Sequence, residues 1–232
     1  MGKIFIDHGI IYEEYANGLV VKGFENQNDK RLKLVIPASL EMENHPNLRP
    51  SHTLVTRIHT RAFINATNLQ SIEIPETIGV IEEYAFNGCQ NVKTVSSYGR
   101  RGENMLVIEK GAFQFCCQLE KVAINRPRIF ISNDAFRTCS NLQVFTGKVS
   151  GLHRNAFDGC NLEILAFVDN ATIRANSIEK SGVKKLFFYG ESFTIAPKIW
   201  TWIKKSDIQI CCSPNSNLVN LVYEGVTVEV LQ

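Results

Sequence analysis

The sequence predicts an α/β repeat protein, a solenoid in which similar units stack along one axis. Five phenylalanines each follow an alanine, and each comes five residues after an isoleucine or a leucine. They recur at intervals of 23, 27, 23 and 21 residues, as Phe63, Phe86, Phe113, Phe136 and Phe157. A period in the twenties is typical of stacked repeats that bury their apolar sides against one another. We therefore expect the phenylalanines to form a buried spine.

Each unit ends in a short segment that alternates in polarity with period two, as a strand with one buried face does. In the first unit this segment is 69–74, and Pro75 follows it. A proline has no N–H to donate, so it ends a ladder of hydrogen bonds. We predict one short strand per repeat, and the strands together form a long parallel sheet.

The middle of each unit predicts a short helical or 3-10 turn opposite the sheet. Phe86 and Cys89 lie three residues apart, a spacing at which one turn directs both side chains into the core. Gly88, and Gly159 at the equivalent place, allow that turn to end.

Four of the seven cysteines occupy this repeat position: Cys89, Cys116, Cys139 and Cys160. Adjacent turns of a solenoid lie about 4.8 Å apart, within disulfide range. Equivalent side chains on stacked turns point the same way, however, and this arrangement does not give the dihedral angle that a disulfide needs. We interpret these cysteines as buried free thiols that act as small apolar residues.

The combined pattern, I-x-x-x-A-F-x-x-C-x-x-L-x-x-I-x-I-P, resembles the BspA-type leucine-rich repeat over residues 58–188. Departures include Ala66 and Ser181 at the cysteine position and Ile178 at the phenylalanine position. The resemblance implies a right-handed leucine-rich-repeat solenoid without catalytic activity. It also implies a family known mainly from bacterial and protozoan surface proteins that bind host matrix or other cells.

We expect a single domain over residues 1–232. A solenoid exposes its core at both ends unless atypical units cover it. Residues 1–55 are expected to form a strand-rich N-terminal cap, 56–195 the repeats, and 196–232 a degenerate repeat with a C-terminal cap. Four extra residues between the second and third repeats predict a protruding loop. In that loop Arg100 and Arg101 are candidates to contact an acidic partner, although a solvated loop is the more ordinary interpretation.

Charge and hydropathy exclude several classes of partner. A formal net charge of +2 and a pI of about 8.1 are far from the basic balance of nucleic-acid-binding proteins. No stretch approaches the length of a membrane span, so we expect no membrane insertion. The first residues lack the apolar region of a signal peptide. The sequence as written therefore predicts a cytoplasmic protein, or a cell-surface or extracellular one if a leader has been removed. The oligomeric state stays open.

Motifs of catalysis and of cofactor binding are missing from the sequence, which predicts neither an enzyme nor a cofactor. His45, His52 and His59 recur at intervals of seven, but they lack a helical register and a cysteine partner, so a metal site is not favoured. Cys160 and His153 have the chemistry of a nucleophile and a base. Cys160 belongs to the buried repeat position, however, where a thiol is inert.

The residues that alternate with buried ones along each strand are expected to face outward, on the concave side of a horseshoe. The predicted partner-binding residues on that side are Lys121, Val144, Thr146, Ile164, Ala166, Lys185 and Phe187. Their apolar members form a patch with lysines on both sides, as protein interfaces often do. A register shifted by one residue would bury the patch instead, and the C-terminal segment is an alternative cover for it.

Two functions are compatible with such a surface. The first is a non-catalytic scaffold that binds a protein or peptide on the concave sheet. The alternative is a cell-surface adhesin for host matrix or glycans, exported through a leader that this chain lacks.

Overall fold

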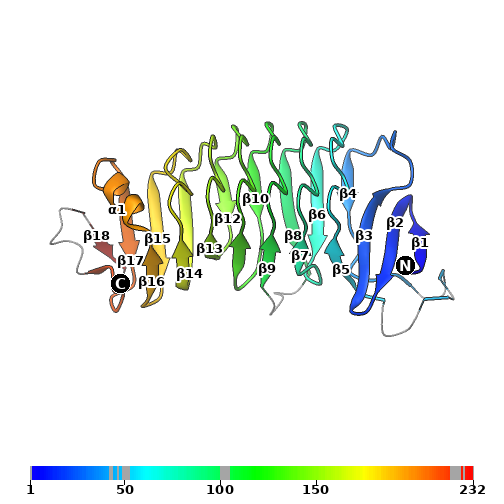
Figure 1. Cartoon of the computed structure of the whole chain (residues 1–232), viewed down its shortest axis with the longest axis horizontal. Helices are drawn as coiled ribbons and strands as arrows, with labels where there is room; N and C mark the ends of the chain where they lie inside the picture. The colour runs from blue at the N-terminus through cyan, green and yellow to red at the C-terminus, as the bar shows by residue number, and fades with distance from the viewer. Residues whose placement is uncertain are drawn as a thin grey trace.

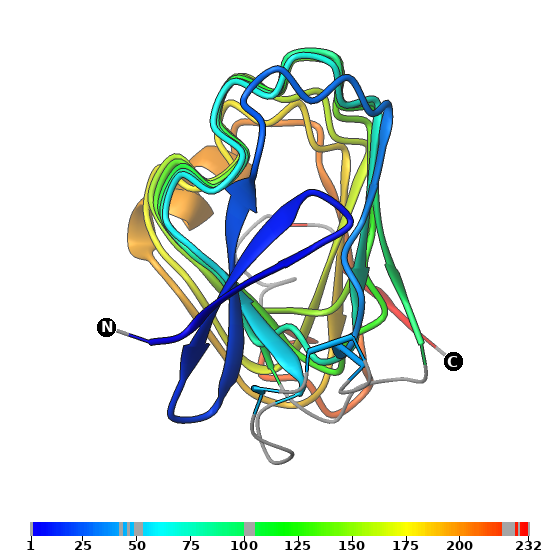
Figure 2. The ribbon, with the colours of Figure 1, turned by 90° about the vertical axis from the view of Figure 1, so that its right-hand side faces the viewer.

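The computed structural model describes residues 2–41, 44–45, 47–48, 53–99, 105–219, 226 and 228–231. Over these residues the chain winds around one elongated hydrophobic core, and successive turns are stacked side by side (Figure 1). Seen along the stacking axis, the turns nearly superimpose (Figure 2). The predicted repeat solenoid is confirmed.

One side of the solenoid is a parallel sheet built from the strands that the alternating pattern predicts. Inward residues such as Val95, Val122 and Leu165 are buried. In spatial order the strands are β4 (Lys33–Val35), β6 (Ser71–Pro75), β8 (Thr94–Tyr98), β10 (Lys121–Ala123), β12 (Val144–Thr146), the first half of β14 (Ile164–Ile173), β15 (Lys185–Tyr189), β17 (Gln209–Cys212) and β18 (Val228–Val230).

Each turn also contains a second strand, which the prediction of one strand per repeat missed. These strands pair in parallel as a second sheet: β3 (Gly18–Phe24), β5 (Val55–Ile58), β7 (Val80–Ile81), β9 (Leu106–Ile108), β11 (Ile129–Ile131), β13 (Val149–Leu152), the second half of β14, and β16 (Phe193–Ile195). The isoleucine or leucine five residues before each phenylalanine lies here. A strand as short as β7 shows no alternation, so the sequence pattern does not reveal it.

The third side, which we call the turn side, is made by the segment around each Ala-Phe pair. Its hydrogen bonds span three residues, as from Ala85 N to Glu82 O (3.2 Å), so the predicted 3-10 character is present but no helix forms. Left-handed residues two positions before and after the phenylalanine interrupt the segment, for example Tyr84 (φ 57°) and Gly88 (φ 73°). The one α-helix among the described residues is α1 (Pro197–Ile203).

The repeat phenylalanines form the predicted buried spine. Neighbouring rings from Phe63 to Phe157 are stacked with centroids 5.1 to 5.3 Å apart and interplanar angles of 2° to 10°. The four cysteines at the repeat position, which we call the ladder cysteines, are free, as expected: Cys89, Cys116, Cys139 and Cys160. Each thiol donates to the carbonyl oxygen of the phenylalanine one turn earlier. From Cys139 Sγ to Phe113 O the distance is 3.1 Å. Burial raises the pKa of the Cys139 thiol, which keeps it protonated as a donor.

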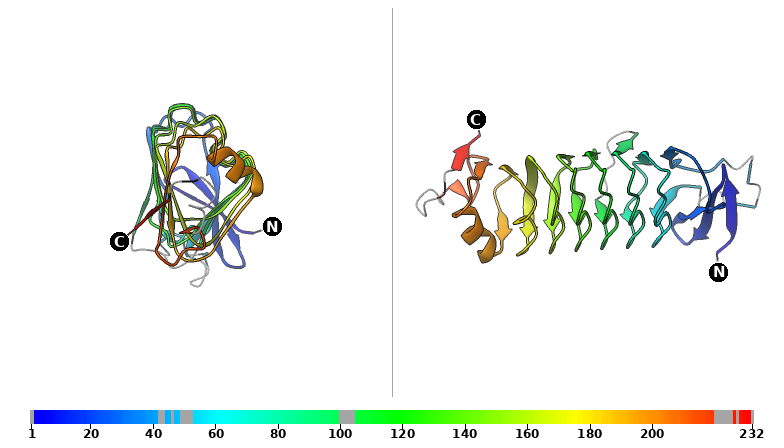
Figure 3. Two further views of the ribbon diagram at one scale, coloured as in Figure 1. Left: turned by 90° about the vertical axis from the view of Figure 1, so that its left-hand side faces the viewer. Right: turned by 90° about the horizontal axis from the view of Figure 1, so that it is seen from above.

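The turns follow a nearly straight axis in both side views (Figures 1 and 3). The expected concave face is therefore close to flat. A horseshoe needs one side of each turn to be wider than the other. Here hydrogen bonds join successive turns on all three sides, including the turn side, where Phe86 N donates to Ala112 O at 2.8 Å. Because successive turns are separated by the same distance, about 4.8 Å, on every side, they stay parallel and the stack does not bend.

The N-terminal end is covered by strands, as predicted. The antiparallel hairpin of β1 (Ile4–Asp7) and β2 (Ile10–Tyr15) crosses the end of the stack (Figure 2). Phe24 packs edge-on against Phe63, with ring centroids 4.7 Å apart, and so covers the first ring of the spine. At the other end, α1 buries Ile199 and Ile203.

Candidate functional site

The candidate site is the outward side of the first sheet from β8 to β15, which we call the strand face. Phe145 and Leu165 point inward and are buried, whereas Val144 and Ile164 are 40% and 46% exposed. This alternation rules out the shifted register, which would bury the predicted patch. Phe187, at the far end of the face, is partly exposed.

Strand pairing brings the predicted residues together in two rows. In the outer row, Lys121 pairs with Val144, Val144 with Ile164, and Ile164 with Lys185. The other predicted residues lie in a second row, two positions further along each strand, which we call the middle row. In this row Thr146 pairs with Ala123, and Ala166 pairs with Phe187. All seven predicted residues therefore lie on one surface.

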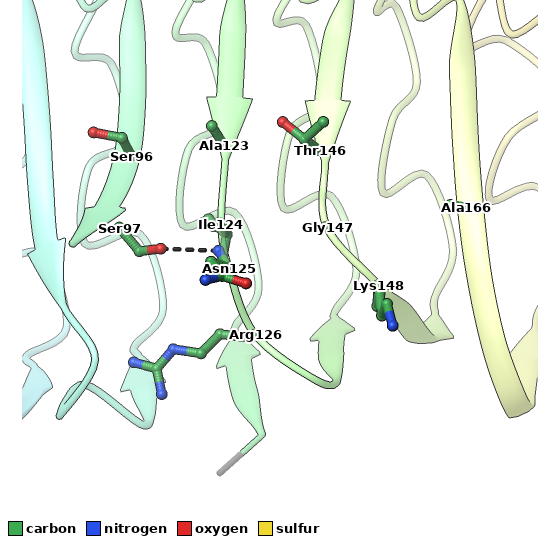
Figure 4. Close-up of a pocket in the computed structure, with 10 residues that line it drawn as sticks. All are labelled: Ser96, Ser97, Ala123, Ile124, Asn125, Arg126, Thr146, Gly147, Lys148 and Ala166. Atoms are coloured by element: carbon green, nitrogen blue, oxygen red, sulfur yellow. Dashed lines mark hydrogen bonds between the residues drawn. The ribbon is translucent and has the colours of Figure 1, made fainter. Parts of the chain in front are cut away.

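A groove of about 560 Å³ lies beside these rows (Figure 4). Its lining residues are mostly small or polar: Ser96, Ser97, Ala123, Ile124, Asn125, Arg126, Thr146, Gly147, Lys148 and Ala166. The small side chains of the middle row form its floor. A Cβ atom on Gly147 would lie 2.5 Å from Ile129 Cδ1, so the chain approaches the core closely there. Such a floor gives a bound main chain room to lie close to the sheet.

Of the ten lining residues, only Thr146 and Ala166 belong to the predicted set. The polar or charged residues Asn125, Arg126 and Lys148 are among the eight that do not. They form what we call the basic corner, where the chain leaves β10 and β12 toward the second sheet. These residues follow the ends of the strands, where the alternating pattern that predicts outward positions no longer applies. Asn125 is anchored here because its N–H donates to Ser97 Oγ at 2.9 Å (Figure 4).

The strand face has a positive character. Its outward positions in β8, β10, β12, β15 and residues 164–168 include no aspartate or glutamate. Lys121 and Lys185 lie on either side of the apolar pair in the outer row. The Lys185 Nζ atom lies 5.0 Å from the centroid of the Phe187 ring and 3.7 Å from Glu229 Oε2. The ring contact orients the lysine beside the apolar patch.

The histidines considered for a metal site do not gather. His45 contacts the Phe5 ring in the N-terminal cap, with centroids 5.8 Å apart, and His59 Nδ1 bonds to Thr60 O. His52 lies outside the described residues, as do Arg100 and Arg101. Within the described parts of the chain, no three His, Cys, Asp or Glu residues are placed to hold a metal ion.

Cys160 and His153 do not form a catalytic pair. The Cys160 thiol donates to Phe136 O at 3.1 Å, as a member of the ladder. The His153 ring instead packs edge-on against Phe130, with centroids 4.7 Å apart. Burial, together with the charge of Arg174, lowers the pKa of His153.

In the described part of the chain, no helix has the length and apolar character that crossing a bilayer requires. The helix α1 has seven residues, whereas a span needs about 20.

Comparison with known proteins agrees with the repeat architecture. The family described as "BspA type Leucine rich repeat region" matches residues 56–184 with six copies. No curated protein matches the chain. The structure is similar to a leucine-rich repeat protein of T. pallidum, with a TM-score of 0.62 and 16% identity over 98% of each chain.

Two further solved structures are less similar. A leucine-rich cell surface protein of Faecalibacterium prausnitzii has a TM-score of 0.37 and 13% identity, covering 100% of this chain and 96% of the other. A leucine-rich repeat protein of Bacteroides ovatus has a TM-score of 0.42 and 11% identity, covering 98% and 100%. Of these three proteins, the T. pallidum protein is similar enough to support the fold, and at this identity it supports the fold alone.

Proposed function

The chain belongs to the BspA-type leucine-rich repeat family, and from this premise we propose that it is a scaffold whose strand face binds a protein or peptide partner. Repeat scaffolds of this family and fold are generally non-enzymatic. The residues proposed to bind are those of the two rows, Lys121, Val144, Thr146, Ile164, Ala166, Lys185 and Phe187.

The observation that carries the proposal is the exposed apolar pair Val144 and Ile164, side by side between two lysines. Contiguous exposed apolar surface with a polar rim is typical of protein interfaces. Exposed apolar side chains on the turn side, such as Ile64 and Phe115, belong to turns that are not adjacent. They do not form a continuous patch.

The groove supports the same proposal. It extends the patch across the small residues of the middle row, so a partner segment has both a concave floor and apolar anchors. Anchors of this kind contribute most of the affinity when they fill pockets near the centre of an interface.

The test is photocrosslinking in cell extracts. A benzoylphenylalanine placed at position 164 should capture one predominant partner. The same reporter at position 64, on an equally exposed isoleucine of the turn side, serves as the matched control. Identical capture from both positions would argue against the strand face as the binding surface.

The adhesin alternative is addressed by offering immobilised extracellular-matrix protein to the purified chain. An adhesin of this build would use the same face, so Ile164→Glu should abolish retention while Ile64→Glu retains it. Retention that survives Ile164→Glu would place matrix binding elsewhere on the molecule.

A further inference from the structure

Arg126, in the basic corner, carries charged donors that the fold leaves unused. The residue is 2% exposed, and its Nη2 donates to the carbonyl oxygens of Pro75 (3.1 Å) and Ile78 (2.9 Å), two turns earlier. Its Nε and Nη1 are buried and have no hydrogen-bond partner among the described residues. Because a guanidinium stays protonated in proteins, two charged nitrogens, which together carry three N–H groups, have no acceptor among the described residues.

A buried charged donor without a hydrogen-bond acceptor destabilises the folded state. Its presence at a groove therefore indicates that a ligand supplies the acceptor. Burial lowers the pKa of Arg126, and the charge of Glu76 opposes that effect. Glu76 nevertheless makes no ion pair with Arg126, and its own Oε2 also has no partner. The contacts that hold the corner together use Nη2 alone. The other two nitrogens make no hydrogen bond with the described residues that an anion would have to break, and because both are buried, the groove must open slightly to admit the anion.

The surroundings of Arg126 favour an anion that arrives through the groove. Arg126 lines the groove together with Lys148, which is exposed (Figure 4). Asn125, next to Arg126, is held by its bond to Ser97 and presents its side-chain amide at the same corner. The outward positions of β8, β10 and β12 carry no carboxylate, and Glu73, which pairs with Ser96 from the neighbouring β6, is bonded to Lys33 Nζ at 2.8 Å.

Resting on the proposed function, we propose that the partner is an extended acidic segment whose carboxylate is received at the basic corner by Arg126, while Lys148 adds positive charge on the other side of the groove (Figure 4). Val144 and Lys148 are four residues apart, which in extended chain is roughly 13 Å. An apolar side chain of the partner that contacts Val144 and Ile164 would thus be followed, or preceded, about four residues away by the carboxylate. Charge-assisted hydrogen bonds and complementary charge give such a segment its selectivity.

Two fluorescein-labelled ten-residue peptides test the inference by fluorescence anisotropy with the full chain. The first carries two leucines and, four residues later, two glutamates. The second has glutamines in place of the glutamates. We expect the glutamate peptide to bind about tenfold more tightly at low salt, a difference of ~1.4 kcal/mol. Salt should reduce that difference, because screening weakens exposed charge contacts.

Three variants locate the effect. Arg126→Gln and Lys148→Glu should each remove the preference for glutamate while leaving the leucine-dependent binding. Lys148 is exposed, so its variant keeps the test valid if Arg126→Gln does not fold. Lys205→Glu, a charge reversal at an exposed lysine after α1, should leave the preference unchanged.

The outcomes separate the two claims. Equal binding of both peptides to the wild-type chain overturns the acidic-segment inference and leaves the proposed function standing. A glutamate preference that survives Lys148→Glu overturns the assignment to this corner. If neither peptide binds, the strand face does not take extended segments, and both the inference and the proposed function fail.

Discussion

The turn side and the strand face come from the same repeats but differ in how much their side chains vary. On the turn side, the Ala-Phe pair recurs in five units and cysteine follows it in four. On the strand face, the outer row changes from lysine to valine, isoleucine and lysine again in consecutive turns. The difference indicates that the turn side holds the stack together, whereas the strand face is free to be specific for a partner.

The physical reason lies in what each side chain contacts. A spine phenylalanine touches an identical ring about 5 Å away on each neighbouring turn, so its size and angle must match both. A ladder thiol must likewise reach the carbonyl oxygen of the preceding turn. Outward strand residues have solvent on one side, and no neighbour fixes their shape.

The largest effect should come from removing one ring of the spine. Phe113→Ala deletes a buried side chain stacked between Phe86 and Phe136, and we expect the free energy of unfolding in urea to fall by about 3–5 kcal/mol. Phe115→Ala is the matched control, because Phe115 is 45% exposed on the same turn and should cost far less. Equal losses for the two variants would show that the spine has no special role.

A smaller loss should follow the removal of one ladder thiol. Cys139→Ala takes away the donor to Phe113 O and leaves a small void, for an expected loss of about 1–2 kcal/mol. Phe113 O retains its bond from Cys116 N, which limits the cost. Cys117→Ala, at a partly exposed cysteine beside the ladder, should change the unfolding free energy by less than about 0.5 kcal/mol. A Cys139→Ala protein as stable as wild type would show that the hydrogen bond from the thiol does not stabilise the fold.

The smallest effect concerns pH and the C-terminal turns. The backbone N–H groups of Ser192 and Glu191, both bonded to Asp169 Oδ1 at 2.8 Å, lower the pKa of Asp169 below its ordinary value of 3.8. The carboxylate therefore stabilises the folded chain above pH 3.8, and this contribution is lost as the pH falls through the lowered pKa. Asp169→Asn should make the thermal midpoint less dependent on pH below 3.8 than in wild type. Superimposable pH profiles would contradict this role.

The strongly periodic parts of the fold were predictable from the sequence. Phe86 and Cys89 recur together in later units, so their burial and their stacking along one axis follow from the repeat alone. The exposure of Val144 and Ile164 followed from the alternation around buried Phe145 and Leu165.

Other features were not predictable because they depend on contacts between turns. β7 has two residues, too few for any period to show. The straight axis follows from hydrogen bonds on the turn side, which the sequence does not display. Arg126 meets its partners Pro75 and Ile78 two turns away, so nothing near it in the sequence marks it as buried.

The most direct test of the division between the two sides is the affinity of the crosslinked partner for two matched variants. Ile164→Glu and Ile64→Glu change residues that are 46% and 42% exposed, on the strand face and the turn side respectively. Both should fold with wild-type stability, and only Ile164→Glu should weaken binding, by at least about tenfold. Equal binding by the two variants, or a loss confined to Ile64→Glu, would contradict the assignment of recognition to the strand face.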